Sequence, residues 1–354
     1  MHSARNPFIL PVHRTLSLIA AALAVSLAST ACTTAGDVSE PTKAKRSPSA
    51  TAAPKPTPAL TPAAARDALT HYSKTNNLAR MSKDRELLDT VEGGPQHAMS
   101  LADLKEEEGL PKADRKPYRP WAYNLAKTDV YIPRLAPGKQ RWFAAVTRAG
   151  TKEQLARVLV LAQNAETKQW EMVSTVDIDD PQGLPQILLD ADGYATAVDP
   201  ASPKLAAPVG TLRSAVGDNF TTGGSQVFTP TKASERQAKV HRQAVAKFGK
   251  RGTTRFTAGK AQYPGAYALK TATGTLVIFS HTHVQDDAVA EPGLRIVPEK
   301  YDRAWLGTTP SPAFTYTFTC SDVAAVPAAA GPSSLLGYGC RRTDAKATGP
   351  STAV

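Results

Sequence analysis

The chain has 354 residues, a formal net charge of +11 and three cysteines, and 42% of its residues are hydrophobic. This length favours two domains. The basic residues are dispersed among acids and form no run of five or more, so the sequence does not indicate a nucleic-acid-binding protein. A solvated basic surface is the simplest interpretation of the charge, and attraction to anionic lipid headgroups or wall polymers is the alternative.

The first 31 residues have the three parts of an export signal. Arg5 and Arg14 give a basic start, residues 16–27 form an apolar run, and small residues at 28–31 precede Cys32. Because a transmembrane helix needs about 20 apolar residues, this run is too short to be one, and residues 1–31 are predicted to be a signal peptide. Its removal takes away Arg5 and Arg14 and no acid, which lowers the net charge from +11 to +9.

Cys32 follows this signal directly and has two alternative fates. Ser29 and Ala31 are the small residues that a general signal peptidase prefers, and cleavage there would release the chain. The segment also resembles a bacterial lipobox, in which the cysteine is lipidated. A lipobox prefers Leu, Val or Ile three residues before the cysteine, whereas Leu27 lies five residues before Cys32.

The cysteine count favours lipidation. Cys320 and Cys340 lie 20 positions apart and are predicted to form a disulfide, which is worth about 3 kcal/mol in the chain-entropy model. In an exported chain with three cysteines, one is left without a partner. We therefore expect Cys32 to carry a lipid that anchors the protein to the outer face of the cell membrane. The alternatives are release into the medium and a free thiol.

Two segments are predicted to be disordered. Residues 32–61 are rich in Ala, Pro, Ser, Thr and Lys, a composition that cannot bury enough apolar surface to offset chain entropy. They are predicted to form a linker that lifts the folded part away from the membrane. Residues 345–354 are predicted to form a loose tail.

Residues 62–200 are predicted to form an N-terminal α+β domain. Pro62 begins a helix in which Leu69 and Tyr72 lie on one face, and a polar helix is expected at 101–108. Alternating or continuous apolar runs, separated by turns, then predict an antiparallel meander with strands at 123–132, 141–148, 154–162 and 170–178. The proline-rich stretch at 181–208 is predicted to connect this domain to the next.

Residues 201–344 are predicted to form a C-terminal α+β domain with the same order of elements. Helices are expected at 209–220 and 233–248. Strands are expected at 254–258, 266–271, 275–284 and 314–319. The turn Ala272-Thr273-Gly274 is predicted to join two of these strands as a hairpin.

The Cys32 region, the Ala/Pro-rich linker and the stretch from Gly183-Leu184-Pro185-Gln186-Ile187 to Asp192-Gly193-Tyr194-Ala195 resemble those of lipobox-bearing lipoproteins of high-GC actinobacteria. Helices followed by a curved meander, twice over, are similar to two tandem cone-shaped domains of the NTF2-like type. The resemblance implies helices packed on one face of each sheet. It also implies a pocket between sheet and helices, which is catalytic in some such cones and only a binding site in many.

His281 and His283 are weak candidates for a metal site. Residues i and i+2 of a strand point to the same face, so both imidazoles could approach one ion, with Asp286 or Asp287 as a further ligand. The alternative is a hydrogen-bonded or solvent-facing pair, because the sequence fixes no third ligand. We therefore predict no resident metal and no other cofactor.

Two other groups of side chains have similar ambiguity. Asp177, Asp179 and Asp180 end a predicted strand, where they are typical of a solvated turn and only weakly suggest calcium. Four tryptophans are expected to pack in the core or to line a concave sheet face: Trp121, Trp142, Trp170 and Trp305.

No segment has a recognisable catalytic constellation. The stretch 331–337 is not a nucleophile elbow, because Leu335 stands where the second glycine should be. We therefore predict a binding or protein-interaction role in the cell envelope. The partner would be an envelope protein, a wall polymer or a small apolar ligand. One alternative is an enzyme of the isomerase or hydrolase type that uses a cone pocket, and another is a structural accessory of a membrane complex.

Overall fold

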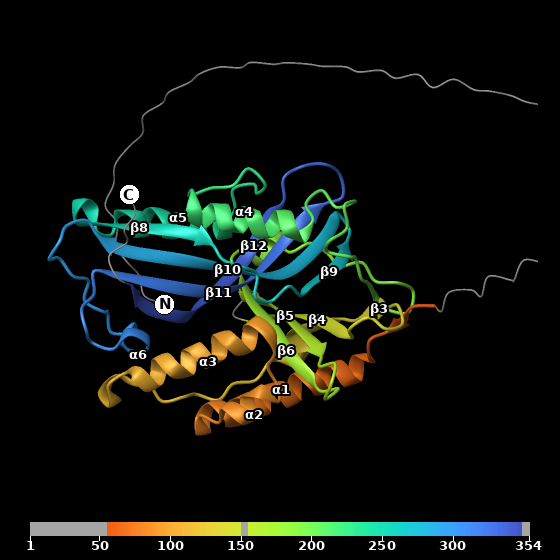
Figure 1. The fold of residues 1–354 in the computed structure, drawn as a ribbon. Coiled ribbons are helices and arrows are strands. Elements are labelled where there is room, and N and C mark those ends of the chain that lie inside the picture. Colours follow the sequence, from red (N-terminus) through yellow and green to blue (C-terminus); the bar gives the residue numbers. More distant parts are fainter. Residues whose placement is uncertain (1–54, 150–154, 349–354) are drawn as a thin grey trace, which may run out of the picture. The chain divides into compact units, whose positions relative to one another are not determined.

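The computed structural model describes residues 55–149 and 155–348. The predicted signal peptide, Cys32 and the last six residues of the predicted tail lie outside the described residues. Within the part that is described, no helix is both long and apolar enough to cross a membrane. The fold is α+β, with helices flanking two larger antiparallel sheets (Figure 1).

The first large sheet has the predicted meander. Its strands are β2 (Thr128–Tyr131), β4 (Trp142–Ala149), β5 (Leu155–Gln163) and β6 (Trp170–Ile178). They are arranged in the order β2-β4-β5-β6, and every neighbouring pair is antiparallel. The strand expected from residue 123 begins only at Thr128, because a 3₁₀ helix occupies Leu125–Lys127.

Three helices precede this sheet: α1 (Pro62–Ser82), α2 (Arg85–Asp89) and α3 (Gly94–Gly109). The first and third contain the predicted helical segments, although both run further than predicted. Helix α1 ends at Ser82, and the next residue, Lys83, adopts the left-handed conformation with φ of 57° and caps the helix. The Asp84 carboxylate then accepts a hydrogen bond from the Leu87 amide, which caps α2.

A small sheet involves the end of the predicted linker, in the order β1-β3-β7. It consists of β1 (Thr57–Pro58), β3 (Pro133–Leu135) and β7 (Ala195–Thr196). Ala59 is only 2% exposed, and its carbonyl accepts a hydrogen bond from Arg141. The prediction of disorder is therefore wrong for residues 57–61, because backbone pairing and this arginine hold a segment that has few apolar side chains of its own.

The second large sheet has the order β12-β11-β10-β8, with β9 also paired to β10. Its strands are β8 (Gly252–Ala258), β9 (Ala266–Thr271), β10 (Gly274–Val289), β11 (Ala313–Pro327) and β12 (Ser334–Thr348). The predicted hairpin is confirmed, since β9 and β10 pair antiparallel and Thr271 lies opposite Gly274. Helices α4 (Val209–Thr221) and α5 (Lys232–Ala246) precede this sheet, as expected, and the short α6 (Arg303–Leu306) lies between β10 and β11.

Strand β12 was not predicted. It pairs along β11, and Ala345, Lys346, Ala347 and Thr348 lie opposite residues 313–316. The prediction of a loose tail is therefore wrong for residues 345–348. The sequence of β12 mixes glycine, arginine and alanine without clear alternation, so neighbouring strands rather than its own pattern determine its structure.

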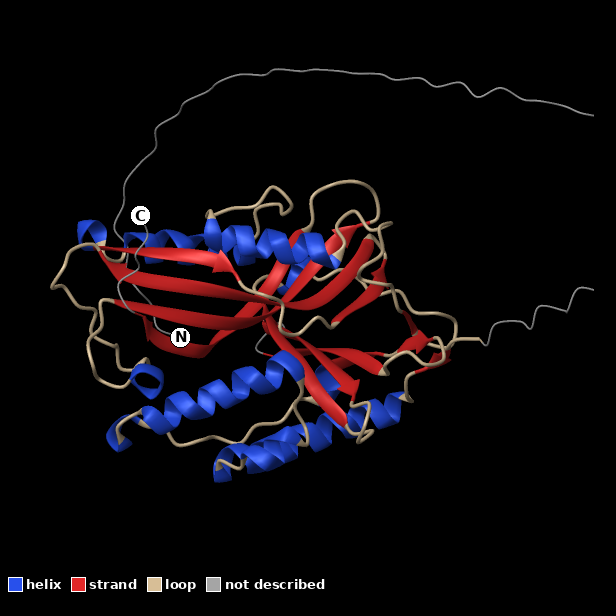
Figure 2. Cartoon of the chain, viewed as in Figure 1, coloured by secondary structure: helices blue, strands red, loops and turns tan. Residues whose placement is uncertain are grey.

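The larger elements form four layers: helices, sheet, sheet and helices (Figure 2). In β4, Phe143 and Ala145 face α1, whereas Trp142, Ala144 and Val146 face the second sheet. In β10, Leu276 and Ile278 face the first sheet, while Val277 and Phe279 face α4. Since alternate residues of a strand point to opposite faces, both sheets are apolar on both sides.

The predicted domains, 62–200 and 201–344, each supply one layer of helices and one large sheet. Residues from both sides of that boundary share one hydrophobic cluster, in which Val158 and Val176 pack with Leu276 and Ile278. The division into two domains therefore stays a prediction.

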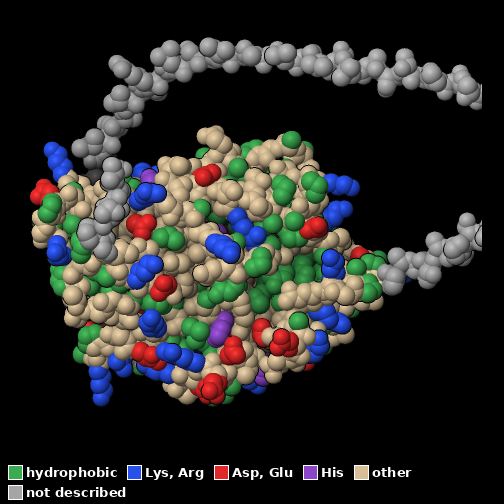
Figure 3. Space-filling view, viewed as in Figure 1, with side chains coloured by type: hydrophobic (Ala, Val, Ile, Leu, Met, Phe, Trp, Pro, Cys, Tyr) green, Lys and Arg blue, Asp and Glu red, His purple; other side chains and the backbone are tan. Residues whose placement is uncertain are grey.

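The charged side chains are mixed on the surface. On the face in Figure 3, lysines and arginines are interspersed with aspartates and glutamates. Ion pairs among the described residues include Arg157–Asp177, Arg236–Asp179 and Arg134–Asp190. This mixture agrees with the dispersed basic residues of the sequence.

Candidate functional site

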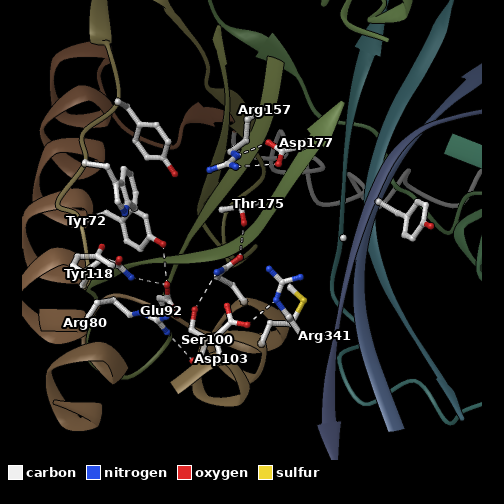
Figure 4. Close-up of a pocket in the computed structure, with 17 residues that line it drawn as sticks. Tyr72, Arg80, Glu92, Ser100, Asp103, Tyr118, Arg157, Thr175, Asp177 and Arg341 are labelled. Carbon is white, nitrogen blue, oxygen red and sulfur yellow. Dashed lines mark hydrogen bonds and ion pairs between the residues drawn. The ribbon is translucent and has the colours of Figure 1, made fainter. Parts of the chain in front are cut away.

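A polar cavity of about 340 Å³ lies among α1, α3, β5, β6, β12 and the loop that contains Tyr118 and Trp121 (Figure 4). Helix α1 presents Tyr72, Asn76 and Arg80 to it, and their spacing of four residues places them on one helical face. Helix α3 contributes a similar stripe that includes Gln96, Ser100 and Asp103. Facing polar stripes of two helices thus form one side of the cavity.

Glu92 is the most unusual group in the cavity wall. It lies between α2 and α3, is 1% exposed, and is held through a bridge to Met172 of β6. Its Oε1 accepts hydrogen bonds from the Tyr72 hydroxyl at 2.8 Å and from Asn76 Nδ2 at 2.9 Å. Its Oε2 is buried and has no hydrogen-bond partner among the described residues.

Burial raises the pKa of Glu92 to about 7, and the hydroxyls of Ser100 and Tyr72 and the Arg80 guanidinium limit the rise. Burial and the neighbouring Glu92 carboxyl also raise the pKa of Tyr72 well above its ordinary value. The Tyr72 hydroxyl therefore remains a hydrogen-bond donor, while Glu92 can exchange a proton near neutral pH.

Arginine–carboxylate pairs lie at other parts of the wall. Arg157 on β5 binds Asp177 on β6 through two hydrogen bonds of 2.7 and 3.0 Å, and Asp177 raises the pKa of the guanidinium. Arg341 on β12 donates to Asp103 at 2.7 Å. Because arginines hold both aspartates, Asp177 and Asp103 are not the free carboxylates that Ca²⁺ or Mg²⁺ prefers.

An aromatic wall lies beside these polar groups. The Trp121 ring lies 6.0 Å from Tyr72 and 4.9 Å from Tyr123, measured between centroids. Asn77 fixes the loop that carries them, since its Oδ1 accepts from the Tyr118 hydroxyl at 2.8 Å and its Nδ2 donates to the Trp121 carbonyl at 2.6 Å. The cavity therefore combines flat apolar surfaces with hydrogen-bond donors and acceptors.

His281 and His283 lie elsewhere, on β10 under α4, in a second buried group. His281 Nδ1 is 2.6 Å from Asp322 Oδ2, and His281 Nε2 is 3.2 Å from His283 Nδ1. The expected further ligands do not join them: Asp286 binds the Thr315 hydroxyl, and Asp287 binds the Thr254 hydroxyl. Burial and the neighbouring His281 lower the pKa of His283 well below its ordinary value.

Cys320 and Cys340 form the predicted disulfide between β11 and β12. Its Cys320 sulfur lies 3.7 Å from His283 Nδ1. Nothing in the sequence connects the histidines with the cysteines. The register of β10, β11 and β12 places His281, Cys320 and Cys340 opposite one another. Cys32, the predicted lipidation site, lies outside the described residues.

The three aspartates at the end of β6 do not converge. Asp177 pairs with Arg157, Asp179 with Arg236 and Asp180 with Lys232. The tryptophans are likewise divided. Trp121 lines the polar cavity and Trp142 lies in the core between the sheets, whereas Trp170 packs against Phe143 and Trp305 donates to Glu106. The four tryptophans therefore do not line a single sheet face.

Sequence reasoning missed Glu92, Arg80 and Gln96 as parts of one site. The repeat of polar residues every four positions along α1, from Tyr72 to Arg80, was the signal that could have indicated a polar helix face directed inward. Glu92 had no such signal, because it lies in a turn between two helices.

Comparison with known proteins identifies a relative across nearly the whole chain. The chain is 52% identical over 338 residues to the uncharacterized lipoprotein SCO6871 of Streptomyces coelicolor, which covers 94% of each chain. No solved structure matches the chain. The model of one family matches residues 56–347, and the chain belongs to this family, described as Domain of unknown function (DUF8094).

Proposed function

We propose that the protein is an extracytoplasmic lipoprotein, anchored through Cys32, that binds a saccharide unit of a wall polymer in the polar cavity. The cavity carries this proposal, because aromatic rings adjoin convergent hydrogen-bonding groups in a volume of about 340 Å³. Binding sites for small molecules commonly combine flat apolar surface with a few fixed polar groups.

The chemistry of the wall matches a hydroxylated ring. Each sugar hydroxyl both donates and accepts hydrogen bonds, and Arg80, Asn76 and Gln96 supply groups of both kinds. The C–H face of a sugar is apolar, and Trp121 or Tyr118 offers an aromatic face to cover it. A small apolar ligand fits less well, since it would cover Glu92 and three arginines without forming hydrogen bonds to them.

The anchor is supported by the relative, whose name describes a lipoprotein, and by the spare cysteine. The tandem NTF2-like arrangement also belongs to this proposal. The support for it is that helices precede and cover an antiparallel sheet in each half of the described chain. Under this proposal residues 33–54 are the tether between the lipid and the folded part.

Calorimetric titration of the protein with soluble, purified wall saccharide fragments tests the binding role. We expect saturable binding that weakens about tenfold or more in Trp121→Ala and in Arg341→Ala, because each removes a wall contact. Tyr263→Ala, which alters a separate cavity, is the matched control and should leave affinity unchanged. Absence of binding by the wild-type protein would refute the saccharide assignment.

Membrane fractionation tests the anchor separately. Cys32→Ala should move the protein from the membrane fraction to the medium, while Cys320→Ala should not. If Cys32→Ala remained in the membrane fraction, the lipid anchor would be ruled out.

An enzyme is the second candidate, and one observation favours it. Glu92, with a pKa of about 7, can act as a general acid or base at neutral pH. Mass spectrometry of the same fragments after incubation would detect a hydrolysed product, and nuclear magnetic resonance would detect an isomerised product, which has the mass of its substrate. For this candidate, product should form with the wild-type protein and not with Glu92→Gln, whereas binding without product would support the first candidate.

A further inference from the structure

Four side chains that can bind a metal meet on three neighbouring strands. His281 on β10 lies opposite Cys320 on β11, and Cys320 lies opposite Cys340 on β12. His283 is two residues further along β10, so its side chain is on the same face of the sheet as that of His281. Each of the four side chains has one potential ligand atom in the group, and these four atoms all lie within 4.8 Å of one another.

The distances are close to those of a tetrahedral site. Zn²⁺ binds sulfur at about 2.3 Å and imidazole nitrogen at about 2.0–2.1 Å, which places ligand atoms about 3.3–3.8 Å apart. His281 Nε2 and His283 Nδ1 are 3.2 Å apart, and Cys320 Sγ is 3.7 Å from His283 Nδ1. The two sulfurs, which are now bonded to each other, would have to separate.

A carboxylate already orients one of the histidines. Asp322 Oδ2 accepts a hydrogen bond from His281 Nδ1 at 2.6 Å, which leaves the Nε2 lone pair directed at the group. Histidines that bind metals usually donate their second ring N–H to a carboxylate or carbonyl in this way. Asp322 is 0% exposed, and its Oδ1 has no partner among the described residues.

Neighbouring aromatic rings hold His283, and the half-buried Cys340 leaves the group accessible from solvent. The His283 ring stacks between Phe220, at a centroid distance of 4.1 Å, and Phe318, at 5.0 Å. His281, His283 and Cys320 are buried, whereas Cys340 is half-buried on the sheet. A metal ion or a reductant would reach the group from the Cys340 side, and a dry shell would strengthen its binding.

We propose that His281, His283, Cys320 and Cys340 form a zinc site when the disulfide is reduced. The protein would then have two exclusive states, a disulfide form and a zinc dithiolate form. A low-molecular-weight dithiol or a phosphine is the reductant: it supplies two electrons, the S–S bond breaks, and two protons complete the two thiols. The dithiol is oxidised to its own disulfide, which supplies the two protons, whereas the phosphine is oxidised to a phosphine oxide by water, which supplies the oxygen atom and the two protons. Zn²⁺ then replaces these two thiol protons, which return to solvent.

The histidines need only a change of tautomer. With His281 Nδ1 donating to Asp322, the proton between the two imidazoles resides on His283 Nδ1. In the zinc form this proton moves to His283 Nε2, and Nδ1 becomes the ligand. A site with two neutral imidazoles and two thiolates compensates the charge of Zn²⁺ and matches the sulfur and nitrogen set that zinc prefers over Ca²⁺ or Mg²⁺.

Metal analysis of the full chain tests this directly. The protein is reduced with a phosphine, freed of reagent under nitrogen, dialysed against Zn²⁺ and analysed for zinc per chain. We expect one zinc per reduced chain and none per oxidised chain. Co²⁺ in place of Zn²⁺ should give a thiolate-to-cobalt charge-transfer band together with the visible bands of a tetrahedral ion.

Variants decide which residues bind the metal. His283→Ala and Cys340→Ser should lose stoichiometric zinc and the cobalt bands. His71→Ala, at an exposed position, should retain both, and so should Cys32→Ala, at the third cysteine of the sequence. If His283→Ala does not fold, as judged by near-ultraviolet circular dichroism, Asp322→Asn takes its place and should weaken zinc binding about 10-fold to 100-fold. Failure of the reduced wild-type protein to bind zinc, or binding that depends on Cys32, would overturn the proposal.

Discussion

Glu92 shows how position alone can give a common residue an uncommon property. Its carboxyl is 1% exposed, accepts from Tyr72 and Asn76 through one oxygen, and has a pKa raised to about 7. Burial penalises the charged form, and Arg80, whose charge acts on Glu92, donates its hydrogen bond to the Ser100 carbonyl at 3.1 Å. Ionisation of Glu92 therefore costs the folded state free energy.

Glu92→Gln tests this cost through the pH dependence of stability. Since the pKa is higher in the folded state than in the unfolded state, the folded state binds more protons between about pH 4.5 and pH 7, and stability falls as pH rises through this window. The full loss, about 3 kcal/mol, is reached above about pH 7 and is absent below about pH 4.5. Urea unfolding of Glu92→Gln at several pH values should lack this fall.

The exposed Glu166 provides the control for that measurement. Glu166→Gln should leave the pH dependence of the wild type in place. A fall of equal size in Glu92→Gln and in the wild type would show that Glu92 is ionised at little cost, which would also weaken its case as a proton donor.

For single residues, the sequence predicted the disulfide but not the residues of the polar cavity. Cys320 and Cys340 could be paired by counting, because a disulfide needs only two cysteines and a short loop. Glu92 could not be singled out, since its burial depends on Met172, which is 80 positions away and forms a bridge with it. A local pattern carries no information on such a contact.

Helix α1 illustrates what fixes an element at its ends. Thr61 precedes Pro62 in extended conformation, and its side-chain oxygen accepts a hydrogen bond from the Ala64 amide at 3.2 Å. This cap and the proline are local signals, so the start of the helix could be predicted. The order of the residues before Thr61 could not be predicted, because β1 is held by β3, which lies more than 70 residues away in the sequence.

Thr61→Ala should lower the free energy of unfolding by about 1 kcal/mol, because one amide at the start of α1 loses its acceptor. Thr61→Ser keeps a side-chain oxygen and should restore most of the loss. Lys74→Ala, at an exposed position of the same helix, should change stability by less than about 0.5 kcal/mol. Equal stability of Thr61→Ala and the wild type in urea unfolding would contradict the role of the cap.

Strands were predictable where their residues alternate and not where neighbours impose the structure. The meander from β4 to β6 has regular alternation with Phe143 and Ala145 on one side and Ala144 and Val146 on the other. The long strands β11 and β12 contain Ala- and Gly-rich stretches and two register shifts, so their extent depends on mutual pairing. For this reason only residues 314–319 of β11 were expected.

The whole described fold depends on how its two large sheets meet. Apolar side chains of β4, β5 and β6 pack against those of β10 and β12, with Leu336 among them. The backbones also make direct contact, since the Asp179 amide donates to the Leu336 carbonyl at 3.0 Å. The polar cavity lies beside this junction, where Asp177, Tyr338 and Gly339 all contribute to its wall. The packing of one sheet on the other could not be derived from the sequence. A sheet that is apolar on both faces does not specify which face packs on a helix and which packs on another sheet.

Gly337 permits the close approach at this junction. A methyl group at position 337 would overlap the carbonyl oxygen of Asp177, and backbone cannot move aside as a flexible side chain could. Gly337→Ala should therefore lower the free energy of unfolding by about 1–3 kcal/mol, the usual cost of overpacking. Gly339→Ala is the matched control two residues along β12, because nothing lies within 4 Å of the added methyl group.

The control should be neutral or slightly stabilising, by up to about 1 kcal/mol, since alanine restricts the unfolded chain more than glycine does. Guanidinium unfolding of both variants under one set of conditions gives the comparison. The difference between them isolates the contact with β6, because both substitutions add the same methyl group to the same strand. If Gly337→Ala were as stable as Gly339→Ala, β12 could not approach β6 this closely, and Tyr338, Gly339 and Arg341 would no longer be expected to complete the cavity that Glu92 and Asp177 line.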